Sequence, residues 1–372
     1  MSLTIQDYIT AVQSTNRKHV CKIEVLDQYQ NVLEIIQEDI ISGNVNINNS
    51  LGARRSATLT LKNDDGKYSP SYRGTLWIQK RIRIFSGLNI NGEDYFIDKG
   101  IFVISEVQAI SNFSEKLAII TLLDKFSFLD GTIAGDLTSE YIIPVGTNVR
   151  DAVIAIFQQA GEVIFPVIYT TSETTPYTII KNSGDTYSSL LTDLANMVSY
   201  TCYYSKFGIP MFVQPTNEQL EHETYNFSTT EVNYLGSTHR FKFDSVKNTV
   251  FVYGDNIEGH LVKASSIDTN WFSSTRVSLI GTRSLIITDE NIYTDQLAQD
   301  RSDYELKKAI ILQESVDLQS IPIDLINEGD VITILDSSNL LNRDRYLVNS
   351  ISTPLLSNGN ATLNCWKIRA IT

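Results

Sequence analysis

Alternation of apolar and polar residues along short segments is the feature that most limits how the first 131 residues can fold. Val20–Leu26 is a clear example, and five further segments share this period: 45–47, 57–61, 81–85, 100–105 and 117–122. Successive side chains of a β-strand point to opposite faces of a sheet, so this period favours strands with one buried face. Asn91-Gly92, between two segments, is typical of a hairpin turn. We therefore predict an antiparallel sheet or barrel, preceded by a short helix that Ser2 caps.

The period changes to that of a helix between residues 132 and 232. Apolar stripes predict one helix over 148–160, capped by Thr147 and ended by Gly161, and a second over 186–199, capped by Asp185. Each helix is followed by a short apolar segment that we expect to be a strand: 163–165 and 201–204. A hairpin is expected over 204–213. This part of the chain is predicted to be a small α+β domain.

Alternation returns in residues 233–372. Strands are predicted at 249–254 and 284–288, a longer helix at 290–308, and a final hairpin set from 329–334, 345–350 and 361–368.

A weak internal repeat links the first and third parts. Arg81–Ile84 corresponds to Asp330–Ile334, Ile104-Ser105 to Ile351-Ser352, and each copy ends in a further strand. Unrelated antiparallel hairpins could also produce such similarities. We predict a β-rich α+β fold in which two related antiparallel β-barrel-like domains, 1–131 and 233–372, flank the α+β domain 132–232.

Charge narrows the possible partners. The net charge is −13, of which the three predicted domains carry −1, −8 and −4 in chain order. An acidic chain is disfavoured as a binder of duplex DNA or of anionic membranes, which both require a basic face. No run of about 18 apolar residues exists for a membrane span, and residues 1–14 lack the layout of a signal peptide. The three cysteines are far apart, so we expect reduced thiols.

The residue patterns of known active sites are missing, so we predict no catalytic, cofactor-binding or metal-binding residues and no enzyme. Glu221-His222-Glu223 is a poor metal cage, because adjacent strand residues point to opposite faces and only Glu221 and Glu223 share one. Asn63–Tyr68 lacks the alternating ligands of a calcium loop and is expected to be a turn. Arg54-Arg55 and Lys80–Arg83 are expected to pair with acids at a subunit contact or to lie in solvent.

Several motifs, in order along most of the chain, resemble those of phage baseplate and tail hub proteins. Asn63–Pro70 followed by Lys80–Ile84 resembles one such stretch, and Gly184–Ala195 resembles another. Pro144–Ala152, Glu328–Ile332 and Tyr346–Ile351 also fit the family. Gln79 departs from it, since the family often has glycine there, which leaves the local turn type open.

The resemblance implies a structural virion protein of the tail baseplate, assembled in the host cytoplasm. Three copies would form a ring that joins the sixfold tail tube above to a threefold central spike below, beside other baseplate wedge proteins. DNA would pass through the ring without specific binding, and no membrane insertion is implied. Because the chain ends soon after the last predicted strand, it resembles a hub without an added lytic domain. Two alternatives remain: a tail-associated cell-wall hydrolase or sugar-binding protein, and a hexameric distal tail adaptor.

Overall fold

The fold is described from a computed structural model of the chain. It describes residues 3–50, 52–72, 74–169, 173–175, 178–198, 200–214, 222–257, 260–289, 292–310, 313–356 and 359–368. The chain forms two compact units. The first contains Met1–Ser237 and Leu318–Thr372, and the second contains Thr238–Asp317.

The first 131 residues form the predicted antiparallel sheet after one short helix. The helix α1 spans Ile5–Val12, and its cap is Thr4 rather than the predicted Ser2. Thr4 caps it because its hydroxyl accepts from the backbone N of Asp7, whose carboxylate in turn accepts from the backbone N of Thr4. Seven strands follow: β1 Lys18–Leu26, β2 Val32–Ile36, β3 Ile40–Asn48, β4 Arg55–Lys62, β5 Arg81–Ile90, β6 Glu93–Ser111 and β7 Lys116–Asp124.

These strands lie in the order β3-β4-β7-β6-β5-β1-β2, and every neighbouring pair is antiparallel. The predicted hairpin turn joins β5 to β6, with φ of 53° at Asn91 and 94° at Gly92. Both residues need the left-handed backbone that this turn type requires. One face of the sheet is buried, as the alternation predicts, and Ile23, Leu59 and Ile120 are each 0% exposed.

The middle segment holds two helices and short strands. The elements are a 3-10 helix η1 Lys125–Phe128, β8 Tyr141–Ile143, α2 Val149–Gln159, β9 Val167–Ile168, β10 Ile179–Lys181, α3 Tyr187–Met197, β11 Thr201–Tyr204 and β12 Pro210–Val213. Apolar residues of α2, α3 and the strands form a common core. The predicted hairpin is confirmed, because β11 pairs with β12 in antiparallel fashion.

Three details predicted for this segment are wrong. Asn148 rather than Thr147 caps α2, because the Thr147 hydroxyl donates instead to the carbonyl O of Pro144. Thr186 rather than Asp185 caps α3, because the Asp185 carboxylate accepts from the backbone N of Asn182. The segment 163–165 is not a strand. Its apolar residues Val163 and Phe165 are exposed, and the nearby strand is β9.

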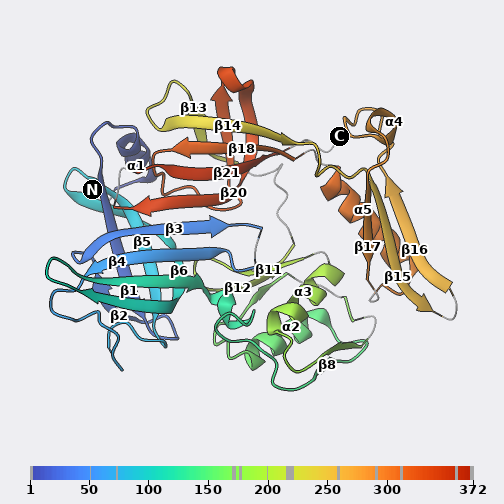
Figure 1. Ribbon diagram of the computed structural model, residues 1–372, viewed down its shortest axis with the longest axis horizontal. Coiled ribbons are helices and arrows are strands. Elements are labelled where there is room, and N and C mark those ends of the chain that lie inside the picture. Colours follow the sequence, from blue (N-terminus) through green and yellow to red (C-terminus); the bar gives the residue numbers. More distant parts are fainter. Residues whose placement is uncertain are drawn as a thin grey trace. The chain divides into compact units, whose positions relative to one another are not determined.

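The rest of the first unit is a second set of strands. They are β13 Glu223–Ser228, β14 Tyr234–Lys242, β18 Gln313–Ser320, β19 Val331–Asp336, β20 Leu341–Leu355 and β21 Ala361–Lys367, with a 3-10 helix η2 at Ser337–Asn339. Their order is β14-β18-β21-β20, with β19 beside β20 and β13 beside β19. The boundary between the two units falls within β14 and β18. Strand β20 also pairs with β3, so both sets belong to one 13-stranded sheet, and Figure 1 shows β20 in red beside β3 in blue.

The second unit is a small sheet with two helices, inserted between β14 and β18. It contains β15 Thr249–Ile257, β16 His260–Ile267, α4 Val277–Ile280, β17 Ser284–Thr288 and α5 Asp295–Ala309. The helix predicted at 290–308 begins later, at the cap Thr294, and residues 290 and 291 lie outside the described ones. The β-rich α+β fold class is confirmed. The domain boundaries at 131 and 232 stay a prediction. In the described ranges no helix has the length and apolar character of a membrane span.

Candidate functional site: a repeated sheet and its junction

Two three-stranded groups of the first unit have the same irregularities at the same positions. β5, β6 and β7 form one group, and β19, β20 and β21 form the other. The β5–β6 register shifts between Ile84 and Phe85, and the β19–β20 register shifts between Ile334 and Leu335. Since bulges are specific local features, their coincidence indicates equivalent strands rather than a chance likeness of hairpins.

A second pair of shifts fixes the alignment of the long strands. The β6–β7 register shifts between Ile104 and Glu106, and the β20–β21 register shifts between Val348 and Ser350. Ile104-Ser105 is therefore equivalent to Val348-Asn349. The sequence alignment with Ile351-Ser352 is wrong by three residues, because both segments carry an Ile-Ser pair and the bulge leaves no mark in the sequence.

The equivalence extends to the hairpins before each group. Lys62 N donates to Asp39 O over 2.7 Å where β4 meets β3, and Ile321 N donates to Asn233 O over 3.2 Å where β18 meets β14. The buried faces also correspond, with Ala57, Leu59 and Leu61 on β4 and Val316, Leu318 and Ser320 on β18. Strand β14 is thus the equivalent of β3. One difference is that β1 runs antiparallel to β5, whereas β13 runs parallel to β19.

The two sets meet where the second half of β20 pairs with β3. The pairing is antiparallel, from Ser350 opposite Asn48 to Leu355 opposite Gly43. It buries alternate residues of β20: Ile351 is 5% exposed, Thr353 3% and Leu355 1%. We call this pairing the internal seam.

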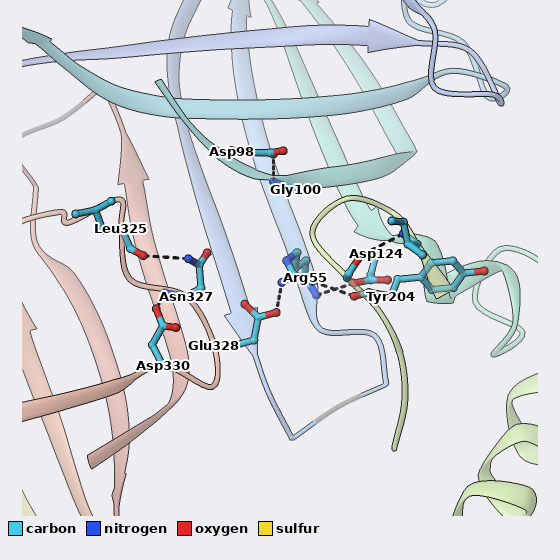
Figure 2. A network of polar contacts seen from close by, with 11 residues as sticks. Arg55, Asp98, Gly100, Asp124, Tyr204, Leu325, Asn327, Glu328 and Asp330 are labelled. Carbon is cyan, nitrogen blue, oxygen red and sulfur yellow. Dashed lines mark hydrogen bonds and ion pairs between the residues drawn. The ribbon is translucent and has the colours of Figure 1, made fainter. Parts of the chain in front are cut away.

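A buried polar network, drawn in Figure 2, lies at the start of β4. The Arg55 guanidinium pairs with Glu328, which precedes β19, and donates to the carbonyl O of Tyr204 over 3.1 Å. The Arg55 side chain is 4% exposed and that of Glu328 is 7%. Gly100 has φ of 132°, and a Cβ there would lie 3.0 Å from Arg55 Cδ, so glycine leaves room for this side chain. Arg55 therefore ties both strand sets to the end of β11.

The carboxylate of Asp124 extends this network. It accepts from Arg55 N over 3.2 Å and from Phe126 N over 2.9 Å. Burial raises the pKa of Asp124 to about 6, and the nearby Arg55 only partly offsets this. Asp124 therefore positions the turn into η1 while it holds a carboxyl group that can take up a proton near neutral pH.

Two further buried ion pairs connect other segments of the first unit. Lys125 Nζ lies 2.8 Å from Glu162 Oε2 and donates to Gly208 O over 2.9 Å. Lys99 Nζ lies 3.2 Å from Asp324 Oδ1, and the Tyr8 hydroxyl donates to Asp324 Oδ2 over 3.1 Å. Burial raises the pKa of Tyr8 well above its usual value, so this hydroxyl stays a donor. The Lys99 and Tyr8 contacts connect α1, β6 and the loop before β19.

The basic residues singled out in the sequence are mostly engaged within the chain. Arg54 stacks on Tyr203, with 3.4 Å between its guanidinium carbon and the ring centroid. Arg83 Nη2 lies 2.6 Å from Asp98 Oδ2, and the Arg81 guanidinium lies over Phe128. The expectation that Arg55 meets acids of another subunit or lies in solvent is wrong, because Glu328 of the same chain satisfies it. No local pattern in the sequence indicates this pairing across 273 positions.

The structure does not bring the remaining sequence candidates together among the residues that it describes. Asn63–Tyr68 is the predicted turn, in which the Asn63 side chain accepts from Tyr68 N. Glu221 lies outside the described residues, and the His222 side chain is exposed. Among the residues that are described, no three His, Cys, Asp or Glu side chains are grouped as metal ligands would be. A cavity of about 340 Å³ is lined by Lys125, Glu162 and Tyr204, whose polar atoms bond to one another.

Comparisons with known proteins concern the fold. No protein-family model and no curated protein matches the chain. A 43 kDa tail protein of prophage MuSo2 from Shewanella oneidensis superposes with a TM-score of 0.64 at 15% identity, covering 94% of this chain and 98% of that one. A tail protein from Neisseria meningitidis MC58 gives a TM-score of 0.67 at 12% identity, covering 95% and 98%.

A third solved structure is the E. coli c3393 protein, with a TM-score of 0.53 at 11% identity over 89% of this chain and 74% of that one. It is described as a component of the type VI secretion system with structural similarity to the T4 bacteriophage tail proteins gp27 and gp5. The chain therefore has the fold of phage tail proteins, which confirms the fold that the sequence resemblance implies.

Proposed function

We propose that the chain is a non-enzymatic structural subunit of a phage-type tail baseplate, and that three copies form a hub between tail tube and spike. The observation that carries this proposal is the duplication of a five-stranded set within one chain, with both bulges kept in place. Three copies of such a chain present six nearly equivalent sheet surfaces. A ring of this kind matches a sixfold tube on one side and keeps threefold symmetry for a spike on the other.

The internal seam and the buried network support a rigid role. Arg55, Lys99 and Lys125 connect segments that are far apart in the chain, and each is paired with a buried acid. Truncating such a pair is strongly destabilising, so these contacts hold both strand sets in one fixed arrangement. A fixed arrangement is what an adaptor between two symmetries needs.

The acidic charge fits the passage of DNA. Residues 132–232 carry a net charge of −8, and a surface of this sign repels phosphate groups. We propose that DNA passes through the ring without specific binding, with other baseplate proteins outside the ring.

The test is an image of the intact tail with this subunit labelled. The label is expected on the tail axis, between tube and spike. Clearing of bacterial cell wall by the purified chain in a zymogram would favour the hydrolase instead. Six copies in one ring would favour the distal adaptor.

A further inference from the structure

The second half of β6 has an unpaired edge. Strand β5 begins at Arg81, which pairs with Val103, so residues 106–111 of β6 pair only with β7. Within the described ranges, no backbone hydrogen bond reaches the other edge of this segment. Glu106, Ala109 and Ser111 are exposed.

The equivalent segment of β20 shows what this edge lacks. Residues 350–352 of β20 pair with β21 on one side, and residues 350–355 pair with β3 on the other side, which forms the internal seam. Ile351, Thr353 and Leu355 are buried there, whereas Val107, Ala109 and Ser111, at the equivalent positions, are half-buried or exposed.

A strand that could pair with the open edge of β6 lies at the β14 end of the strand order. Strand β14 is the equivalent of β3, and its one neighbour among the described strands is β18. Each chain thus contains one internal seam, β20 with β3, and two strand edges that could form a second seam: that of β6 and that of β14. We call this second pairing the open seam. Because these two edges are different surfaces, copies can join head to tail, and such contacts close into a ring when the rotation permits.

The bulges and the equivalent hydrogen bonds fix the register of the open seam. In the internal seam, Ser350 lies opposite Asn48 and Ile351 lies opposite Ile47. The residues equivalent to the first pair are Glu106 and Lys242. Those equivalent to the second pair are Val107 and Phe241. We propose that Glu106–Ser111 of β6 pairs antiparallel with β14 of the partner subunit in this register. The proposal rests on the ring proposed above and names the contact that closes it.

The side chains that this register places opposite one another are complementary in charge and in polarity. Glu106 meets the partner subunit's Lys242, and both are exposed in the single chain. Val107 meets the partner subunit's Phe241, which is 41% exposed in the single chain. Opposite charges and apolar pairs directly across two strands each stabilise a sheet, and a paired edge removes an aggregation hazard.

A disulfide tests the register. Opposite Cα atoms of antiparallel strands lie within the range that a disulfide spans, so the double variant Glu106→Cys/Lys242→Cys should cross-link neighbouring subunits. The variant is produced with the complete tail-gene set, and purified tails are oxidised and run on a non-reducing gel. We expect a ladder that ends in a covalent trimer and collapses on reduction. The control Glu106→Cys/Phe241→Cys places the thiols on opposite faces and should cross-link at least about tenfold less.

The outcomes separate the two proposals. Tails with three copies of the chain but no cross-link, or equal cross-linking in the control, would overturn the register and leave the hub intact. A chain absent from the tails, or present in six copies, would overturn the hub.

Charge reversal covers the case in which the cysteine variant fails to assemble. Glu106→Lys and Lys242→Glu should each reduce incorporation into tails, and the double variant should restore it. Singles without effect, or a double variant that restores nothing, would also overturn the register.

Discussion

Replacing Arg55 with Met tests how strongly the buried network holds the first unit together. The Glu328 side chain is 7% exposed, Arg55 pairs with its Oε1, and its buried Oε2 has no hydrogen-bond partner among the described residues. Removing Arg55 leaves this charge buried and unpaired, and it also removes the donor to Tyr204 O. Loss of one partner of a buried pair costs about 3–5 kcal/mol, and we expect a loss of this size.

The measurement is urea unfolding followed by tryptophan fluorescence. The chain has three tryptophans, of which Trp271 belongs to the second unit and is 74% exposed. A Trp271→Phe background therefore leaves fluorescence that reports on the first unit. A double variant, Arg55→Met/Glu328→Met, removes both charges and should recover about half of the loss or more.

A matched control is Lys181→Met, which breaks a partly exposed ion pair of the same unit with 2.9 Å between Lys181 Nζ and Asp193 Oδ2. Such a pair contributes less than about 1 kcal/mol. The reasoning is refuted if Arg55→Met costs no more than this control, or if the double variant is as unstable as the single one.

Three further predictions concern packing, protonation and thiols. Gly87→Ala should destabilise the first unit by more than about 2 kcal/mol, because the new Cβ would lie 1.8 Å from Tyr95 O. The control Gly236→Ala has open space around its new Cβ and should leave Tm nearly unchanged. Equal Tm values for the two variants would contradict this prediction. As pH falls from 7 to 5, the free energy of unfolding of the wild type should rise by about 1.3 kcal/mol relative to that of Asp124→Asn, as measured by urea unfolding. The reason is that burial raises the pKa of Asp124 to about 6, so the protonation that stabilises the folded state is lost only as pH rises through that value. A difference that stays constant with pH would contradict this prediction. Cys21 and Cys202 should react slowly with a thiol reagent in the native chain and rapidly in urea, because burial raises the pKa of each thiol to about 12; fast native reaction would argue against it.

The elements could largely be predicted because their signals are local. Alternation located the strands of the first sheet, and Asn91-Gly92 located a turn whose two residues need positive φ. The caps were harder, because Thr147 and Asn148 are both good caps and neighbouring contacts decide between them.

The long-range features could not be predicted from one sequence. The insertion between β14 and β18 separates paired strands by about the length of the second unit, so no local pattern marks their pairing. The repeat was found, but its register was wrong by three residues because bulges depend on backbone pairing. The Arg55–Glu328 pair, the centre of the network, joins residues that the chain brings together only when both strand sets have formed.

The central claim is that one chain supplies two equivalent sheet sets, so that three chains supply six. The most direct measurement is the number and place of copies in an intact tail, from cryo-electron microscopy of tails that carry a labelled subunit. We expect three labels in one ring on the tail axis, between tube and spike. Six labels in one ring, or labels away from the axis, would contradict the claim.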